Sequence, residues 1–415
     1  MRFAGALGAA LCVAAGCGGG SMSTAAVAPP LPDAGTPAPD AGAPPDSGVT
    51  PPDAGTPDAG VADAGPDAGI DGGATGCAAL VPPDAGAPVV VNLDVGDPSE
   101  VCAAAQPDEG GSVPLRIATY DASGMHQSVW AFYAGSDGTR LGLQEWASGL
   151  GPVSLLAQPD GFTGIEFTGD AREIDLHDIA GDGKEGSITH TQAREPEGAV
   201  VAVPSGGTVA FAVSGDSTAS NLQFQRFDAH GNLAASATVA SAEPDAQVTW
   251  VAGVATGGDT LVVFSFAGRP CRGIWLDAAG KPVSASFAPP NCRIHRFYPL
   301  LDGSLAAEIS SLDASHSIAF AFAPRAVAST AAPAWLEGRN LREFFILPSD
   351  KGYALRDMGA GQRFRLVLPD GDSCGELAAP ILELGPVQIG RDGTLVEQDL
   401  TGAGCTFRWY PGLFE

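Results

Sequence analysis

The sequence contains few positive charges. Its 415 residues include 21 Lys and Arg against 48 Asp and Glu, which gives a formal net charge of −27 at pH 7. No Lys or Arg occurs between Arg2 and Arg116. Proteins that bind phosphate backbones or anionic headgroups concentrate Lys and Arg on one surface. The composition therefore argues against DNA, RNA and anionic lipid headgroups as partners.

The apolar run at the N-terminus is short. It extends from Phe3 to Ala15, about a dozen residues, whereas a helix that crosses a bilayer needs roughly 20. With Arg2 as a positive end, this length is typical of a secretory signal. We therefore expect residues 1–16 to be a signal peptide.

Cys17 follows three small residues, Ala14, Ala15 and Gly16. This sequence resembles the lipobox of bacterial lipoproteins, although that family more often has Leu or Val at the position of Ala14. The resemblance implies that Cys17 becomes the lipidated N-terminus and attaches the protein to a membrane. Gly18, rather than Asp, after the Cys is compatible with export to the outer membrane of the cell envelope. Ordinary secretion after cleavage at a small residue is the alternative.

The sequence has no C-x-x-C pair that would nucleate a metal site. Cys12 leaves with the signal peptide, and lipidation would use Cys17, so an even number of cysteines remains. An even number fits disulfide pairing in an oxidising compartment. We favour pairing between neighbours in sequence, although 15 connectivities are possible. The proposed pairs are Cys77 with Cys102, Cys271 with Cys292, and Cys374 with Cys405.

Large apolar residues are almost missing from residues 17–86. Pro-Asp-Ala-Gly units begin at Pro32, Pro39, Pro52, Pro57, Pro66 and Pro83. Such a segment has little to bury, and its like charges and prolines favour an extended, solvated chain. It resembles the spacers of many lipoproteins from bacteria with GC-rich genomes. We expect a disordered tether that holds the domain formed by residues 87–415 away from the membrane.

Helix signals are also scarce, because no long stretch has apolar residues spaced by three and four. Short β-rich runs such as Ser128–Tyr133 and Leu261–Phe266 end instead at Gly, Asp, Asn or Pro. We therefore expect an all-β fold.

Turns recur in two series with a step of about 46 residues, close to the size of a four-stranded propeller blade. The first series is Asp160-Gly161, Gly206-Gly207, Gly257-Gly258, Asp302-Gly303, Asp350-Lys351-Gly352 and Asp392-Gly393. The second is Asp137-Gly138, Asp182-Gly183, Gly231-Asn232, Gly280-Lys281, Ala323-Pro324-Arg325 and Asp370-Gly371. The period predicts a β-propeller with six blades, or seven if Leu115–Tyr120 joins Cys405–Pro411 in one blade. Tandem β-sandwiches are the alternative.

The segment from Asp178 to Gly186 resembles the calcium loop of FG-GAP propeller blades. Asp178 and Asp182 match its first and fifth positions, and Gly183 matches its turn. Ala180 and Gly186 stand where two further ligands are expected. A plain hairpin turn is the alternative to a calcium site, and we expect no other cofactor.

A group of basic residues surrounds two of the cysteines. If Cys271 and Cys292 pair, they would bring these residues together on neighbouring strand ends. Guanidinium groups bind carboxylates through two parallel hydrogen bonds, so an acidic glycan is a conceivable ligand. Salt bridges within the protein are the alternative. The group consists of Arg269, Arg272, Arg293, His295 and Arg296.

The common local catalytic motifs are missing: the sequence has no G-x-S-x-G, no H-E-x-x-H and no glycine-rich phosphate loop. His177 and His190 flank the FG-GAP-like loop and could face each other across its hairpin, but two His alone do not make a metal site. We expect a lipid-anchored, non-catalytic binding module of the bacterial cell envelope, with an envelope protein or a glycan as its partner. The alternative is a propeller enzyme that acts on extracellular polysaccharide or peptide.

Overall fold

The structure is a computed structural model. It describes residues 76–80, 86–93, 101–120, 126–145, 154–168, 173–194, 199–215, 220–240, 247–256, 258–311, 315–358, 363–377, 385–399 and 405–414. The predicted signal peptide, Cys17 and most of the predicted tether lie outside the described residues.

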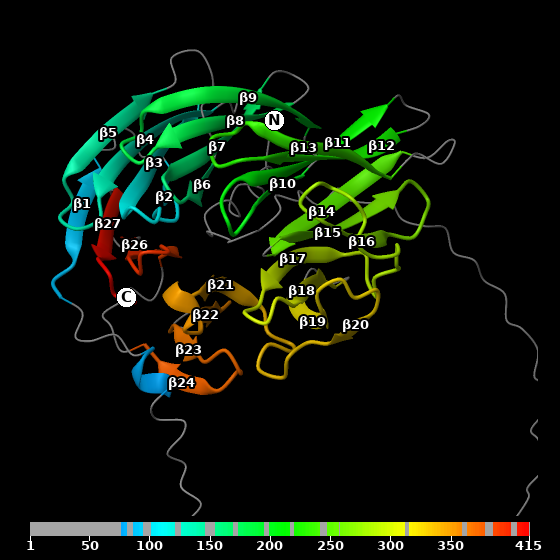
Figure 1. The fold of residues 1–415 in the computed structure, drawn as a ribbon. Coiled ribbons are helices and arrows are strands. Elements are labelled where there is room, and N and C mark those ends of the chain that lie inside the picture. Colours follow the sequence, from blue (N-terminus) through cyan, green and yellow to red (C-terminus); the bar gives the residue numbers. More distant parts are fainter. Residues whose placement is uncertain are drawn as a thin grey trace, which may run out of the picture.

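Seven antiparallel sheets make up the described part of the chain. They are arranged in a ring, with the first strand of each sheet toward the axis and the last at the rim (Figure 1). This arrangement is a seven-bladed β-propeller. It confirms the predicted all-β class and the predicted propeller. Of the two predicted blade numbers, six and seven, seven is correct, and the alternative of tandem β-sandwiches is wrong.

The first six blades use strands that are consecutive in sequence. Blade 1 contains β2 (Val101–Ala104), β3 (Ser112–Tyr120), β4 (His126–Ala134) and β5 (Arg140–Glu145). Blade 2 contains β6 (Ser154–Gln158), β7 (Gly161–Thr168), β8 (Glu173–Ala180) and β9 (Glu185–Arg194). Blade 3 contains β10 (Ala199–Ala202), β11 (Thr208–Gly215), β12 (Ser220–Phe227) and β13 (Leu233–Ala240).

The remaining blades follow the same order, with an irregular fourth strand in blade 4. Blade 4 contains β14 (Val248–Thr256), β15 (Asp259–Phe266) and β16 (Arg272–Leu276), and two isolated bridges, Gly273 with Phe287 and Leu276 with Pro282, replace a fourth strand. Blade 5 contains β17 (Ile294–Pro299), β18 (Leu305–Ser310), β19 (His316–Phe322) and β20 (Ser329–Ala331). Blade 6 contains β21 (Leu341–Ile346), β22 (Tyr353–Asp357), β23 (Arg365–Val367) and β24 (Ser373–Glu376), with a 3₁₀ turn, η1 (Pro348–Asp350), after β21.

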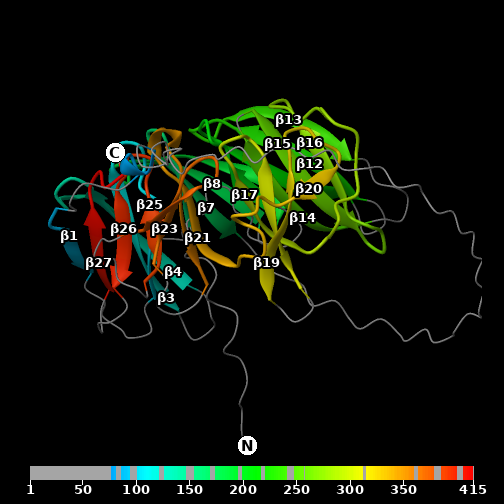
Figure 2. The ribbon, with the colours of Figure 1, turned by 90° about the horizontal axis from the view of Figure 1, so that it is seen from below.

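Blade 7 closes the ring with strands from both ends of the domain. It contains β25 (Val387–Ile389), β26 (Leu395–Asp399) and β27 (Cys405–Tyr410), and its fourth strand is β1 (Val89–Leu93). Figure 2 shows β1, β27 and β26 side by side, and Val89 to Leu93 pair with Trp409 to Cys405. The predicted closing segment, Leu115–Tyr120, was wrong because those residues belong to β3 within blade 1. The apolar run Val89–Val91 supplies the closing strand instead.

Two disulfides reinforce the same closure. Cys102 on β2 bonds to Cys405 on β27, and Cys77 bonds to Cys374 on β24. The predicted neighbour pairing was therefore wrong for these four cysteines. It was right for Cys271 and Cys292, which flank the hairpin that turns at Asp277. Chain closure explains the difference, because the N-terminal segment pairs with strands near the other end of the sequence.

Residues 76–80, which the sequence placed in the tether, contact blade 6. Besides the disulfide of Cys77, the side chain of Leu80 is only 2% exposed and packs in the cluster that contains Phe345, Leu366 and Leu395. The packed structure therefore begins before β1.

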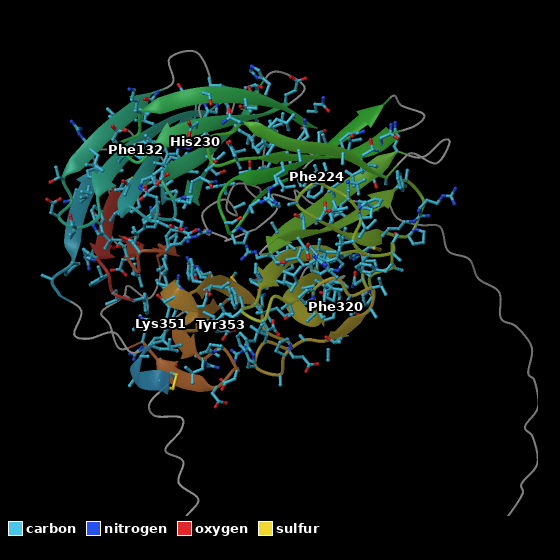
Figure 3. The ribbon with its side chains drawn as sticks, in the orientation of Figure 1. Phe132, Phe224, His230, Phe320, Lys351 and Tyr353 are labelled. Carbon is cyan, nitrogen blue, oxygen red and sulfur yellow. A yellow bond between two sulfur atoms is a disulfide. The ribbon has the colours of Figure 1, made fainter. Side chains whose placement is uncertain are left out.

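The hydrophobic core is divided among the joints between blades. Each of seven buried clusters joins a different pair of neighbouring blades, for example Phe132 with Phe162 between blades 1 and 2, and Tyr298 with Phe344 between blades 5 and 6. Figure 3 labels Phe132, Phe224 and Tyr353, which come from three different blades. Because both faces of a blade are covered, the second strands of blades 3 and 4, β11 and β15, contain nearly continuous apolar runs.

The two predicted turn series correspond to two fixed places in the blades. The first series joins the first and second strands of blades 2 to 7. The second series follows the third strand in blades 1 to 6 and leads to the fourth strand, or in blade 4 to the segment that makes the isolated bridges. Each series has six members because blade 1 makes its first turn at Asp108–Gly111, and blade 7 takes its fourth strand from β1. One series begins in blade 1 and the other ends in blade 7, so the two series of six turns together mark seven blades.

A β-bulge recurs near the start of the innermost strand in three successive blades. The register shifts between Val248 and Trp250 in blade 4, between Ile294 and Arg296 in blade 5, and between Leu341 and Glu343 in blade 6. A bulge changes the direction of a side chain and is common next to functional sites. In blade 5 the extra residue is His295.

Candidate functional site

The five basic residues singled out from the sequence lie at one end of blades 4 and 5. Arg269 lies in the turn after β15, and Arg272 begins β16. Arg293 immediately precedes β17, which contains His295 and Arg296. Because the second strand of a blade ends where its first strand begins, all of these positions belong to the same end of the propeller.

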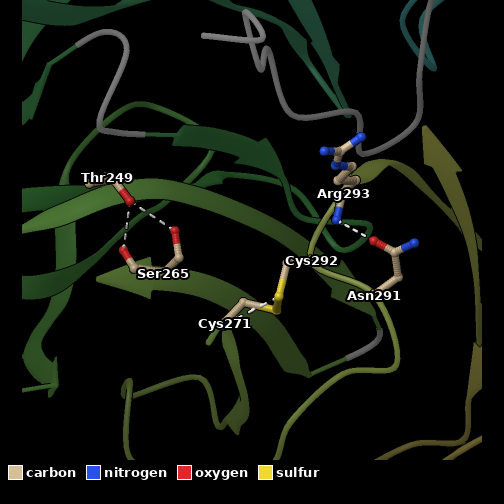
Figure 4. Close-up of a disulfide and its surroundings, with 6 residues drawn as sticks. All are labelled: Thr249, Ser265, Cys271, Asn291, Cys292 and Arg293. Carbon is tan, nitrogen blue, oxygen red and sulfur yellow. Dashed lines mark hydrogen bonds between the residues drawn. A yellow bond between two sulfur atoms is a disulfide. The ribbon is translucent and has the colours of Figure 1, made fainter. Parts of the chain in front are cut away.

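The disulfide between Cys271 and Cys292 joins the two segments that contain these residues. The Cα atoms of the two cysteines are 5.6 Å apart, and the backbone N–H of Cys271 donates to Sγ of Cys292 over 3.3 Å. Figure 4 shows this bond together with Arg293, whose backbone N–H donates to Oδ1 of Asn291 over 2.7 Å. The bond therefore fixes the start of β17 beside the start of β16.

The basic residues differ in their exposure to solvent. Arg269, Arg272 and Arg293 are exposed, whereas His295 and Arg296 are half-buried. The guanidinium carbon of Arg296 lies 5.9 Å from the centre of the Tyr298 ring. The site therefore has an outer rim of arginines and an inner part formed by β17.

Two further residues complete the inner part of the site. His316, at the start of β19, lies 3.9 Å from His295 between ring centroids. Glu308 on β18 is opposite Arg296 in the β17–β18 register. The ligand atoms of His295, Glu308 and His316 all lie within 4.8 Å of one another.

Glu308 is a buried carboxyl group with one unsatisfied oxygen. Its residue is 1% exposed, and Oε2 accepts a hydrogen bond from the Tyr298 hydroxyl over 3.2 Å. Oε1 is buried and has no hydrogen-bond partner. Burial raises the pKa of Glu308 above its usual value, and the opposing effects of Arg296, the Tyr298 hydroxyl and the Leu341 N–H only partly offset it.

Both imidazoles of the site are held in their neutral form. Burial, followed by the charges of His316 and Arg296, lowers the pKa of His295 to about 4. Burial and Arg296 also lower the pKa of His316 below its usual value. At neutral pH each ring therefore offers a nitrogen lone pair, which can accept a proton or bind a metal ion.

The sequence did not point to Glu308, His316 or Tyr298. His295 and His316 come from strands that do not pair with each other, and β18, which contains Glu308, lies between them. Only the register of two hairpins, each containing a bulge, brings the three side chains together. A single sequence carries no signal for that register.

The FG-GAP-like loop is the turn between β8 and β9. Oδ1 of Asp182 accepts from the Lys184 N–H over 3.0 Å, as Asp137 does from Thr139 over 2.8 Å at the equivalent turn of blade 1. Gly183 has φ +83°, and a Cβ there would lie 2.3 Å from the Phe132 ring of blade 1. Turn geometry and packing thus account for Asp182 and Gly183, and calcium at Asp178 and Asp182 stays a prediction.

The structure separates His177 from His190, for which the sequence had left open that they face each other across the hairpin. In the β8–β9 register His177 lies opposite Ile188, whereas His190 lies opposite Asp175 and contacts its carboxylate at 2.9 Å. His177 is buried between two carboxylates: Nε2 lies 2.8 Å from Oε2 of Glu166, and Nδ1 lies 2.5 Å from Oε1 of Glu185. Burial lowers the pKa of His177, but these two contacts outweigh it and raise the pKa overall.

In the described part of the chain, one group of three or more His, Cys, Asp or Glu residues is close enough to hold a metal ion. It consists of His295, Glu308 and His316. Among the same described residues, no helix has the length and apolar character needed to span a membrane.

No protein-family model matches the chain, and no curated protein matches it. Several solved structures are similar to it at low identity. The β-propeller domain of the Trilobed protease from Pyrococcus furiosus is 11% identical, with a TM-score of 0.45 over 78% of this chain and 96% of that one. An acylaminoacyl peptidase from Pyrococcus horikoshii is 11% identical, with a TM-score of 0.44 over 71% of this chain and 50% of that one. The polysaccharide lyase Uly1 is 9% identical, with a TM-score of 0.42 over 72% of this chain and 88% of that one. Similarity at this level assigns no activity to the chain.

Proposed function

We propose that this protein is an extracytoplasmic binding module that holds a carboxylate-bearing ligand at the end of blades 4 and 5. The observation that supports this proposal most strongly is the gathering of Arg269, Arg272 and Arg293 on an exposed rim of a chain with a net charge of −27. In such an acidic protein, a local excess of guanidinium groups attracts anions to one place.

Acidic glycans fit this rim best. The carboxylate of a uronic acid can accept two parallel hydrogen bonds from one guanidinium group, and a polymer can engage several arginines at once. An acidic segment of an envelope protein offers the same carboxylates. Because the overall charge repels polyanions, we expect binding to depend on the site rather than on the general field of the protein.

The proposal includes attachment to the bacterial cell envelope. Cys17 would carry the lipid that anchors the protein, most simply in the outer membrane, and the Pro-Asp-Ala-Gly segment would act as a spacer. The propeller would then present its ligand site at a distance from the membrane.

The test is a binding titration of the full chain with oligogalacturonate and with a neutral glucan of the same length. We expect saturable binding of the acidic oligomer alone. Arg272→Ala and Arg293→Ala should each weaken it about tenfold, which corresponds to about 1.4 kcal/mol. Arg391→Ala is the matched control, because Arg391 is also exposed but lies in the turn between β25 and β26 at the opposite end of the propeller.

Catalysis on an extracellular polysaccharide is the second candidate function. It is favoured by the neighbouring His295, His316 and Tyr298, whose side chains are of the types that transfer protons in enzymes. The same titration separates the two functions, since a binding module returns the oligomer unchanged and an enzyme shortens or modifies it. An equal loss of binding in the Arg391→Ala control would contradict both functions at this site.

A further inference from the structure

We infer that His295, Glu308 and His316, which lie on three adjacent strands of blade 5, form a binding site for a transition-metal dication, Zn²⁺ in particular. Two imidazoles and one carboxylate are a ligand set found in zinc enzymes, where a fourth position stays open for water or substrate. The inference rests on the geometry of these three residues, and it stands whether or not the rim of arginines binds a glycan.

The geometry of the three side chains is close to that of a metal site. Their ligand atoms lie within 4.8 Å of one another. Ligands that bind zinc at about 2.0–2.2 Å are at most about 4 Å apart. A small rotation of the His295 and His316 rings would therefore close the site around an ion.

The buried, unpaired oxygen of Glu308 indicates that a positively charged ligand would be stabilised at this place. A buried carboxylate oxygen without a hydrogen bond is costly, and native structures rarely keep one. Oε1 of Glu308 is in this state, although Arg296 lies opposite Glu308 in the register. A metal ion bound by Oε1 would remove the cost.

The equivalent place in blade 6 shows how the fold satisfies a buried carboxylate by itself. Glu343 and Arg356 occupy there the register positions of Arg296 and Glu308, with the charges exchanged. Both oxygens of Glu343 accept from Arg356, over 2.7 and 2.6 Å. Blade 5 has the same pair of charges but lacks this two-bond geometry, and it adds two histidines beside the carboxylate.

The ligand types select the metal. Imidazole nitrogen suits Zn²⁺, Cu²⁺, Ni²⁺ and Co²⁺, whereas Ca²⁺ and Mg²⁺ require mainly oxygen ligands. Arg296 opposes any cation at this place, since its charge acts on both histidines and on Glu308. We therefore expect Arg296→Gln to tighten metal binding.

The experiment is a calorimetric titration of the full chain with Zn²⁺, without a polyhistidine tag and after treatment with a chelator. We expect one ion per chain, and at least about tenfold weaker binding in His316→Ala and Glu308→Gln. Even mutation of a residue that only hydrogen-bonds to a metal ligand typically lowers metal affinity about 10- to 100-fold. His190→Ala is the matched control: His190 also contacts a carboxylate, that of Asp175, but among the described residues it belongs to no group of three possible ligands.

Titration of the unmodified chain with Co²⁺ gives a second readout that needs no variant to fold. Two nitrogen ligands and one carboxylate should give visible d–d absorption bands that Zn²⁺ then removes. The inference is overturned if the unmodified chain gives no such bands. It is equally overturned if His316→Ala and Glu308→Gln fold normally and bind Zn²⁺ as tightly as the unmodified chain.

Discussion

Cys102 and Cys405 are separated by 303 positions in the sequence, yet they form a disulfide between blade 1 and blade 7. The bond lies at the joint that β1 also closes by pairing with β27. At the same joint, the indole N–H of Trp409 in blade 7 donates to the carbonyl oxygen of Gly135 in blade 1 over 2.7 Å. A covalent bond, a strand and a buried hydrogen bond therefore hold the two ends of the ring together.

The two long-range disulfides should not contribute independently to stability. When the bond between Cys77 and Cys374 is intact, the bond between Cys102 and Cys405 closes a loop of only about 56 residues, because the first bond already joins nearby positions. When both are removed, a loop of about 300 residues opens. In the chain-entropy description, whichever of the two bonds is removed last should therefore lower the free energy of unfolding by about 1.5 kcal/mol more than the one removed first.

Denaturant unfolding of Cys77→Ser with Cys374→Ser, of Cys102→Ser with Cys405→Ser, and of the chain with all four substitutions measures this difference. The short-range pair Cys271 and Cys292 is the control, since its loss should add to the others without coupling. Additive losses for the two long-range pairs would contradict the proposed closure.

Arg356 and Glu343 should be costly to separate. Both are nearly fully buried, and Arg356 also donates to the Gly385 carbonyl oxygen of blade 7 over 2.7 Å. Removing Arg356 leaves the buried Glu343 carboxylate with only Arg342, whose Nε lies 3.3 Å from Oε1. Breaking a buried pair typically costs about 3–5 kcal/mol, and Arg342 should keep the loss near the lower value. We expect this loss for Arg356→Met in denaturant unfolding, and a much smaller one for Arg356→Met combined with Glu343→Leu. Equal losses in the single and double variants would contradict this account.

Asp108 should make the protein less stable as the pH rises from about 4 to about 6. Burial, with the nearby charges of Asp392 and Asp160, outweighs the hydrogen bonds from the backbone N–H groups of Ser112 and Gly110. The net effect raises the pKa of Asp108 from 3.8 to about 6. Between these values the folded state retains a proton that the unfolded state has lost, so stability falls by about 3 kcal/mol and levels off above pH 6.

Urea unfolding of the unmodified chain and of Asp108→Asn at several pH values isolates this contribution. The stability of the variant should lack the decline, so the difference between the two proteins should grow from pH 4 to pH 6. Asp137→Asn is the control, because the Thr139 N–H lowers the pKa of this exposed carboxyl and its effect has the opposite sign. Parallel pH profiles for Asp108→Asn and the unmodified chain would contradict the prediction.

The propeller was predictable because its turns are local. An Asp or Gly at each turn is determined by the backbone of a few residues, so the period of about 46 residues appears in the sequence itself. The closing strand was not predictable in the same way. Val89–Leu93 has no turn that ties it to β27, and its partner is more than 300 positions away.

The candidate site was predictable only in part. Arg269, Arg272 and Arg293 are near Cys271 and Cys292 in the sequence, so one correct disulfide was enough to place them together. Glu308 and His316 are brought beside His295 by the bulged register of β17, β18 and β19. Sequence reasoning could not anticipate that register.

The most direct test of the proposed binding site is hydrogen–deuterium exchange of the full chain with and without oligogalacturonate. The oligomer should slow exchange in the segments that contain Arg269 to Arg272 and Arg293 to Arg296, and leave the turns at the opposite end of the propeller unchanged. Protection confined to other blades, or no binding at concentrations that saturate known uronate-binding proteins, would contradict the account.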